Sequence, residues 1–346
     1  MALSTVATLT LTSGCTSSQQ RVRARIEEEA IHFKSDGATL SGALYLPAGK
    51  PPYPAVVLFH GSGAQPRDSF SAHWFAEQGI AALAYDKRGV GESTGDFRTV
   101  PFMELADDGL AAIDLLKARK DIDHARIGVW GLSQGGWLGP LAASRSRDIS
   151  FVIAVSGPAV SPGEQMIFYY AEELRAGGLS ESDVADASQM RRTIWTYLES
   201  GQNYEGAKNA LQGAQSKSWY ATVKAQRDSP FDALPTPAEI NAPDYRYTRW
   251  FKKEAVYDPL PALKALHVPA LFLFADHDRL VQVPETVDIL KRLISENQKL
   301  NFTIRIIPNT DHGMRRADSD GFGAASTEYL EAMRDWLQAH LRLPRK

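Results

Sequence analysis

Gly131-Leu132-Ser133-Gln134-Gly135 follows the run 126–130 and precedes the small-residue stretch 136–143. This order predicts a short strand, a sharp turn and a helix. On such a turn the serine backbone is strained and its hydroxyl projects outward, and glycines are needed on both sides because a Cβ would collide with the neighbouring strand or helix. The first N–H groups of the helix would face the site. The pattern predicts Ser133 as a catalytic nucleophile; an ordinary glycine-rich connection is the alternative.

A loop earlier in the chain is predicted to complete an oxyanion hole. Residues 54–59 form an unbroken apolar run, typical of a strand buried on both faces of a parallel sheet, and end in His60-Gly61-Ser62-Gly63. When the nucleophile lies on a strand-to-helix turn, one oxyanion N–H comes from the residue after it and the other from such a loop. The predicted donors are therefore the backbone amides of Gln134 and Ser62. For His60 we expect a structural hydrogen bond rather than proton transfer.

The next predicted strand, 79–85, ends in Asp86-Lys87-Arg88-Gly89-Val90-Gly91-Glu92-Ser93. Its glycines do not make a dinucleotide-binding fingerprint, because the third glycine would fall on Thr94. The charged residues of this loop are expected to fix its own shape.

A nucleophilic serine needs a base, and the base needs an acid that orients it. The predicted strand 268–274 runs into a loop with Asp276 and Asp278, and the predicted strand 301–307 is followed by His312. The order serine, aspartate, histidine, each at the end of a strand, is the one expected for this architecture. His312 is the predicted base. Asp278 is preferred to Asp276 as the acid, because the loop has left its strand there and can reach the next one.

Together these motifs resemble the α/β-hydrolase superfamily in its serine-hydrolase branch, as found in bacterial esterases and serine aminopeptidase-like hydrolases. The resemblance covers roughly residues 28–160 and 258–345, and its elements are 60–63, 86–93, 131–136, Asp278 and His312. It implies an α/β fold, with a mostly parallel, doubly wound sheet and an inserted helical cap. Ala275 departs from the pattern, since many relatives carry glycine before the acid.

The middle of the chain interrupts the strand pattern. Strands stop after 151–158 and resume near Pro269, and helical spacing with polar faces occurs over 165–177, 181–200 and 204–220. We expect a helical cap at 161–258 over the active-site face, inserted between two parts of the hydrolase core at 21–160 and 259–346. An independent second domain is the alternative, disfavoured because the chain must return to complete the same sheet.

Large aromatic residues of the cap are expected to form mostly its own core, with a few lining an apolar substrate pocket. They are Phe168, Tyr169, Tyr170, Trp195, Tyr197, Trp219, Tyr220, Trp250 and Phe251. Glu172 and Glu173 are an alternative site for a substrate ammonium, although acidic pairs on helices are usually solvated surface.

Composition excludes several classes of function. With 346 residues, 44% hydrophobic and 23% charged, the chain is an ordinary globular protein, and its net charge of −3 offers no basic surface for nucleic acid. No second histidine or cysteine lies at metal-ligand spacing from His277, so neither metal nor cofactor is predicted. The single cysteine, Cys15, rules out an intrachain disulfide.

Residues 1–20 predict a lipoprotein signal and tether. The apolar run 1–12 leads into Thr12-Ser13-Gly14-Cys15, which resembles the cleavage box of bacterial lipoproteins. Cleavage before Cys15 and lipidation of its thiol would export the protein and anchor it to a membrane of the cell envelope. The run lacks a preceding basic residue, and Thr12 replaces the usual leucine. A disordered tail on a cytoplasmic protein is the alternative.

The predicted activity is hydrolysis of a small-molecule carboxylic ester through an acyl-enzyme intermediate, without a cofactor. An aminopeptidase or amidase with the same triad is one alternative. A non-catalytic ligand-binding protein on the same fold is another, disfavoured because such a protein has no need of all three groups.

Overall fold

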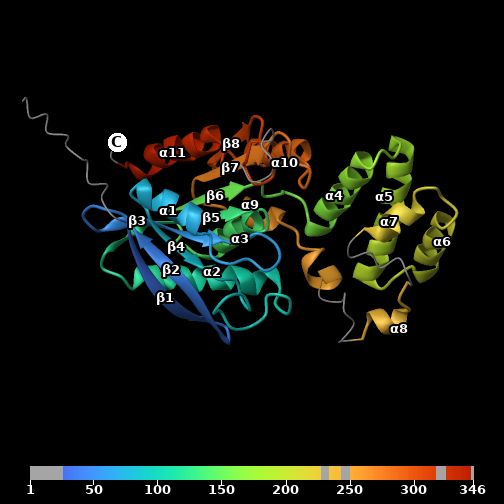
Figure 1. The fold of residues 1–346 in the computed structure, drawn as a ribbon, viewed down its shortest axis with the longest axis horizontal. Coiled ribbons are helices and arrows are strands. Elements are labelled where there is room, and N and C mark those ends of the chain that lie inside the picture. Colours follow the sequence, from blue (N-terminus) through green and yellow to red (C-terminus); the bar gives the residue numbers. More distant parts are fainter. Residues whose placement is uncertain (1–25, 227–233, 243–249, 317–324, 344–346) are drawn as a thin grey trace, which may run out of the picture.

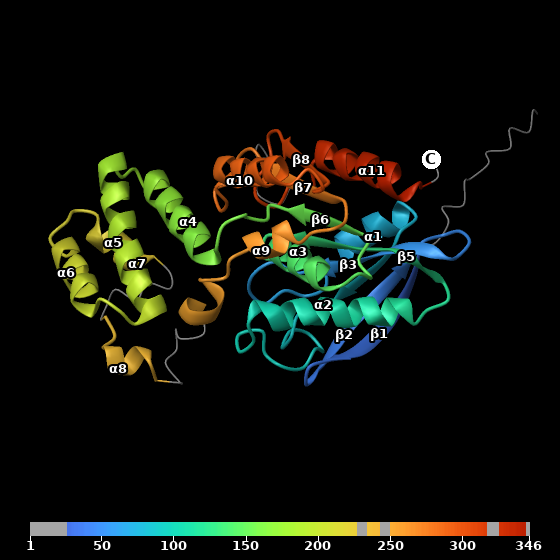
Figure 2. The same ribbon diagram turned by 180° about the vertical axis from the view of Figure 1, so that it is seen from behind.

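The computed structural model describes residues 26–226, 234–242, 250–316 and 325–343; Cys15 lies outside them. Within these residues, eight strands form one sheet in the order β1-β2-β4-β3-β5-β6-β7-β8 (Figures 1 and 2). The strands are β1 (Glu27–Ser35), β2 (Ala38–Leu46), β3 (Tyr53–Phe59), β4 (Ala81–Tyr85), β5 (Ile122–Leu132), β6 (Phe151–Val155), β7 (Ala270–Ala275) and β8 (Phe302–Ile307). The pairs β1–β2 and β2–β4 are antiparallel, and all other pairs are parallel.

Helices cover both faces of the parallel part, because its strands are apolar on both sides. Along β3, Ala55, Val57 and Phe59 enter one hydrophobic cluster, whereas Val56 and Leu58 enter a second one on the opposite face. Helices α2, α3 and α10 complete the first cluster, and α1 and α11 complete the second. Their bounds are α1 (Ser69–Glu77), α2 (Phe102–Lys117), α3 (Gly135–Arg145), α10 (Val283–Glu296) and α11 (Thr327–Leu341).

Between β6 and β7 the chain forms a helical lobe beside the sheet, green to orange in Figure 1. Its elements are α4 (Pro162–Ala176), α5 (Glu181–Ser200), α6 (Tyr204–Ala214), α7 (Tyr220–Ala225), α8 (Pro237–Ile240) and the π-helical turn η1 (Trp250–Glu254); α9 (Leu260–Lys264) then leads back to the sheet. A third hydrophobic cluster has all its buried residues between 167 and 255. The lobe thus has its own core, while the chain on either side of it completes one sheet.

Two local features differ from the sequence predictions. The hairpin β1–β2 was not predicted; its turn is Asp36-Gly37, where both residues have positive φ, as tight hairpin turns require. The helix predicted over 204–220 ends earlier, because α6 ends at Ala214 and the next helix, α7, begins at Tyr220. Ser216 lies in the break and its hydroxyl donates to the Gly213 carbonyl at 3.2 Å, a local bond of the kind that competes with helix continuation. No helix in the described residues is long and apolar enough to cross a membrane.

Candidate active site

Ser133 lies on the sharp turn between β5 and α3. Its φ is +57°, in the left-handed region that a non-glycine residue rarely adopts. Its N–H donates to Val155 of the next strand at 2.8 Å. A Cβ on Gly131 would lie 2.2 Å from the Gly135 carbonyl oxygen, and one on Gly135 would lie 2.7 Å from that of Phe59. Only glycine fits at both positions, which is the close approach that the sequence pattern predicts.

His312 and Asp278 are in direct contact. The imidazole Nδ1 lies 3.0 Å from Asp278 Oδ1 and 2.8 Å from Oδ2. Because a carboxylate only accepts, Nδ1 carries the proton and Nε2 is left with a lone pair. The Asp278 side chain is fully buried, and its Oδ1 also accepts from the backbone of Leu280 and Val281 at 2.8 and 3.0 Å. The carboxylate is therefore held rigidly against the ring.

The other ring nitrogen of His312 is buried and has no hydrogen-bond partner among the described residues. It thus makes no hydrogen bond to Ser133. Ser133, Asp278 and His312 follow β5, β7 and β8, which are parallel strands of one sheet, so all three lie along the same edge. Ser156, just after β6, donates from its hydroxyl to the His312 carbonyl at 2.8 Å.

Asp276, the other candidate acid, does not contact His312. Its Oδ1 lies 2.8 Å from His277 Nδ1 and accepts from the Thr310 backbone at 3.1 Å. Asp276 therefore stabilises the loop after β8, whereas His312 is paired with Asp278. The described residues contain no group of three or more histidine, cysteine or acidic side chains that could hold a metal ion.

The two predicted oxyanion donors lie on the loop after β3 and at the start of α3. Ser62 is exposed and Gln134 is buried, and neither backbone amide donates to another described residue.

His60 Nε2 lies 2.5 Å from the Tyr85 carbonyl, which only accepts, so Nε2 carries the proton. Burial lowers the pKa of His60 to about 4. The ring is neutral near pH 7 and anchors the start of the loop.

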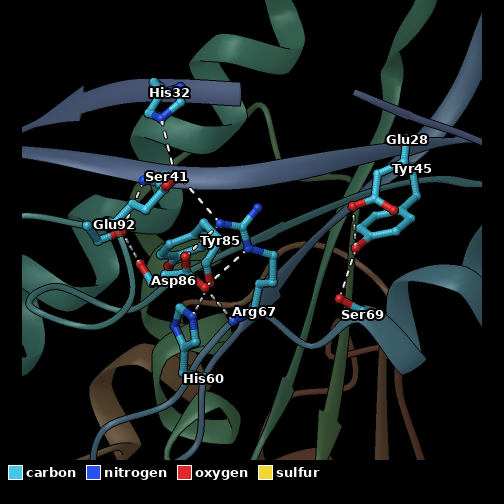
Figure 3. A network of polar contacts seen from close by, with 11 residues as sticks. Glu28, His32, Ser41, Tyr45, His60, Arg67, Ser69, Tyr85, Asp86 and Glu92 are labelled. Carbon is cyan, nitrogen blue, oxygen red and sulfur yellow. Dashed lines mark hydrogen bonds and ion pairs between the residues drawn. The ribbon is translucent and has the colours of Figure 1, made fainter. Parts of the chain in front are cut away.

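The charged loop after β4 forms a polar network with its neighbours (Figure 3). Asp86 Oδ2 lies 2.6 Å from Arg67 Nη2, and Asp86 Oδ1 accepts from the Arg67 backbone at 2.9 Å. Burial would raise the pKa of Asp86, but the hydrogen bonds and charge of Arg67 hold it below its usual value. Arg67 also donates to Ser41 at 3.2 Å, and Ser41 donates to Glu92 at 3.1 Å. The charges of this loop thus stabilise its shape.

The helical lobe contacts the loop that carries Asp278. Gln165 of α4 donates to the Leu280 carbonyl at 2.5 Å, and Arg279 donates to the Glu172 carbonyl at 3.3 Å. The first helix of the insertion therefore contacts the residues directly after Asp278. Of the aromatic residues singled out in the sequence, Tyr170, Trp195, Tyr197, Trp219 and Phe251 are buried in the cluster of the lobe. The Trp250 side chain lies outside the described structure.

A cavity of about 280 Å³ lies between α4, α5 and the chain after η1. Glu199 lines it, and burial together with nearby Glu164 raises the pKa of Glu199 to about 7. Glu199 was not predicted from the sequence, which pointed instead to Glu172 and Glu173, and both of these carboxylates have partners. Glu172 pairs with Arg175 at 2.6 Å, and Glu173 accepts from the Tyr169 hydroxyl at 2.5 Å. Only the packing of α4 against α5 distinguishes Glu199 from a surface acid.

Comparisons with known proteins extend these observations. The sequence profile of the X-Pro dipeptidyl-peptidase (S15) family matches residues 36–312. Esterase EstD of Thermotoga maritima is 27% identical over 271 residues, which are 75% of this chain and 55% of EstD. An uncharacterised 31.7 kDa protein from the traX-finO intergenic region of Escherichia coli is 29% identical over 200 residues. These residues make up 56% of this chain and 65% of the Escherichia coli protein. The matches thus span 55–65% of these relatives' lengths.

The crystal structure of the α/β hydrolase GrgF from a Penicillium species superposes with a TM-score of 0.57 at 19% identity. The superposition covers 91% of this chain and 99% of GrgF. At this identity the likeness concerns the fold alone. It confirms the predicted α/β-hydrolase fold, with its mostly parallel sheet.

Proposed function

The chain belongs to the X-Pro dipeptidyl-peptidase (S15) family and has the α/β-hydrolase fold. We propose that it is a serine hydrolase that cleaves carboxylic esters, with Ser133, His312 and Asp278 as its catalytic triad. The observation that carries the proposal is the contact of Asp278 with His312 Nδ1 at 2.8 Å, which leaves Nε2 as the basic nitrogen. The esterase EstD, which aligns over 75% of this chain, supports an ester substrate.

The proposed reaction gives each of these groups one role. His312 Nε2 accepts the proton of the Ser133 hydroxyl as its oxygen attacks the ester carbonyl, and the backbone amides of Ser62 and Gln134 bind the resulting oxyanion. Collapse of the intermediate expels the alcohol, which takes the proton back from His312. Water then attacks the acyl-enzyme by the same route. Throughout, Asp278 holds the imidazole in the productive tautomer and stabilises its charged form.

Hydrolysis of p-nitrophenyl acetate, butyrate and decanoate tests the proposal, with Ser133→Ala as the control. We expect ester turnover that falls by about 10⁶-fold in the variant. The acyl-chain length of the best substrate would indicate the size of the acyl-binding pocket. Turnover that survives in Ser133→Ala would refute the triad. A folded wild-type protein that is silent on every ester and amide would favour a ligand-binding protein.

A dipeptidyl-peptidase activity is the second candidate, and the family match favours it. An aminoacyl substrate carries an ammonium group. Two half-buried carboxylates line the cavity of the insertion, Glu199 and Glu164, and Glu164 is paired with Arg192. Glycyl-prolyl p-nitroanilide measured beside the esters separates the two activities. If the peptide is the substrate, Glu199→Gln should raise its KM and leave the KM of p-nitrophenyl butyrate unchanged.

Lipid anchoring through Cys15 remains a separate proposal. It rests on the sequence Thr12-Ser13-Gly14-Cys15. Expression of the full chain in a bacterium, followed by membrane fractionation and mass spectrometry, tests it. We expect a diacylated Cys15 in the membrane fraction and release of the protein in Cys15→Ser. Recovery of the unprocessed chain in the soluble fraction would refute it.

A further inference from the structure

The last residue of β4 and the segment that follows it contact the loop 60–67, which follows β3, at several points. The carbonyl of Tyr85 accepts from His60, and Asp86 pairs with Arg67 (Figure 3). The backbone N–H of Lys87 donates to the Gln65 carbonyl at 3.1 Å. These contacts fix both ends of a loop whose middle contains Ser62, one of the two proposed oxyanion donors.

The side chain of Lys87 reaches further, to both halves of the proposed oxyanion hole. Lys87 is only 2% exposed. Its Nζ donates to the Gly61 carbonyl at 2.8 Å and to Gln134 Oε1 at 2.6 Å, and lies 5.1 Å from the centre of the Phe97 ring. Burial of an ammonium is costly unless its donors are paired, so these contacts define one position for the group.

The contact with Gly61 bears directly on the oxyanion donor. The Gly61 carbonyl and the Ser62 N–H belong to the same planar peptide group, and in a trans peptide they point in opposite directions. A cation that binds the carbonyl therefore sets the direction of the N–H, and it also polarises the peptide, which strengthens the donor. The contact with Gln134 Oε1 joins the same ammonium to the residue that supplies the second donor.

We propose that Lys87 is a positioning residue that aims the Ser62 amide and couples it to Gln134, so that both donors meet the oxyanion. This inference rests on the proposed hydrolase mechanism. In this proposal Lys87 does not touch the substrate and carries no proton in the reaction; it acts through the Gly61–Ser62 peptide and through the side chain of Gln134. Its charge also lies behind the Gly61 carbonyl, where it favours negative charge in the transition state.

The test compares Lys87→Met with wild type on p-nitrophenyl butyrate. Methionine keeps the unbranched apolar stem and removes the cation. We expect kcat to fall by about 10- to 100-fold, less than the loss of a whole oxyanion donor, with KM changed by less than about threefold. Active sites are counted by stoichiometric reaction with a fluorophosphonate, so a misfolded fraction does not enter kcat. Lys117→Met, on the surface of α2, is the matched control and should leave kcat unchanged.

Two further measurements separate positioning from a general structural role. The inhibition constant of a trifluoromethyl ketone, which forms the oxyanion, should rise in Lys87→Met by the same factor by which kcat/KM falls. The loss in the double variant Lys87→Met, Gln134→Met should be smaller than the product of the two single losses, because both changes break one contact. A loss of thermal stability with kcat per active site unchanged would overturn the proposal, and so would independent effects of the two changes.

Hydrogen exchange gives a readout that needs no turnover. The peptide spanning residues 60–65 should exchange faster in Lys87→Met than in wild type and in Lys117→Met. Unchanged exchange together with unchanged kcat would overturn the role of Lys87. Wild-type activity that persists in Ser133→Ala would instead overturn the proposed mechanism itself, and the role of Lys87 with it.

Discussion

Both carboxylate oxygens of Asp278 lie within 3.0 Å of His312 Nδ1. Asp278→Asn should place an amide where the carboxylate was, which allows the opposite tautomer of the ring. We expect kcat for p-nitrophenyl butyrate to fall by about 10⁴-fold with the fold intact. Asp276→Asn is the matched control two residues away, and its kcat should fall far less. A larger fall of kcat in Asp276→Asn than in Asp278→Asn would indicate that Asp276 is the acid of the triad.

Ser156 is predicted to support His312 from the end of β6, two strands away in the sheet. Its hydroxyl donates to the His312 carbonyl, and the residue is fully buried. Ser156→Ala should lower stability by about 1 kcal/mol through the lost hydrogen bond. The looser loop should also lower kcat. Ser144→Ala removes a bond of the same length to Leu141 on α3 and serves as the control; its kcat should match wild type.

Gly131 should not tolerate a side chain. The Cβ of alanine would lie 2.2 Å from a backbone oxygen of Gly135, and backbone cannot move aside as a flexible side chain can. We expect Gly131→Ala to lower the free energy of unfolding by more than about 2 kcal/mol, measured in urea. Gly213, in α6, has no atom near an added Cβ. Gly213→Ala should raise stability by about 0.5–1 kcal/mol, and equal effects at the two positions would contradict the structure.

His60 should make the protein sensitive to acid. Its folded-state pKa of about 4 lies below the usual 6.5, so between these values the unfolded state binds the extra proton. Stability should therefore fall as pH is lowered from about 7 to 4, by up to ~3 kcal/mol from this residue. Urea unfolding at pH 7.5 and 4.5 measures the difference. His60→Gln, which keeps a donor for the Tyr85 carbonyl, should show a smaller drop; an equal drop would remove His60 as the cause.

Glu199 should make the stability of the fold depend on pH in the opposite direction to His60. Burial and Glu164 raise the pKa of its carboxyl to about 7, above the ordinary 4.5. The folded state therefore binds the extra proton between these values, and stability from this residue is lost as pH rises from about 4.5 to 7. Glu199→Gln should be more stable than wild type above pH 7 and nearly equal to it at pH 4.5. Thermal unfolding across this range measures the effect, and parallel curves would refute it.

The nucleophile turn and the strands around it could be predicted from local sequence. The buried parallel strands are unbroken apolar runs, as at 54–59 and 268–274. The close packing that requires glycine at positions 131 and 135 is visible in the sequence, because these two residues are the glycines of the motif around Ser133. The hairpin β1–β2 was missed because half of β1 is exposed and shows no such run. Of the two aspartates in the loop after β7, Asp278 was preferred because the loop has left its strand there, and the contact of Asp278 with His312 agrees with that preference.

Contacts between distant residues decided the rest. Asp278 and His312 are 34 positions apart, and Lys87 and Gln134 are 47 positions apart. Neither pair leaves a periodic signal, because a hydrogen bond across the edge of a sheet constrains two side chains and not the pattern between them. A buried lysine after β4 looks the same in sequence as a solvated one. The order of residues thus established the fold and the nucleophile candidate, whereas tertiary packing paired Asp278 with His312, oriented the imidazole ring and placed the ammonium of Lys87 against the Gly61 carbonyl.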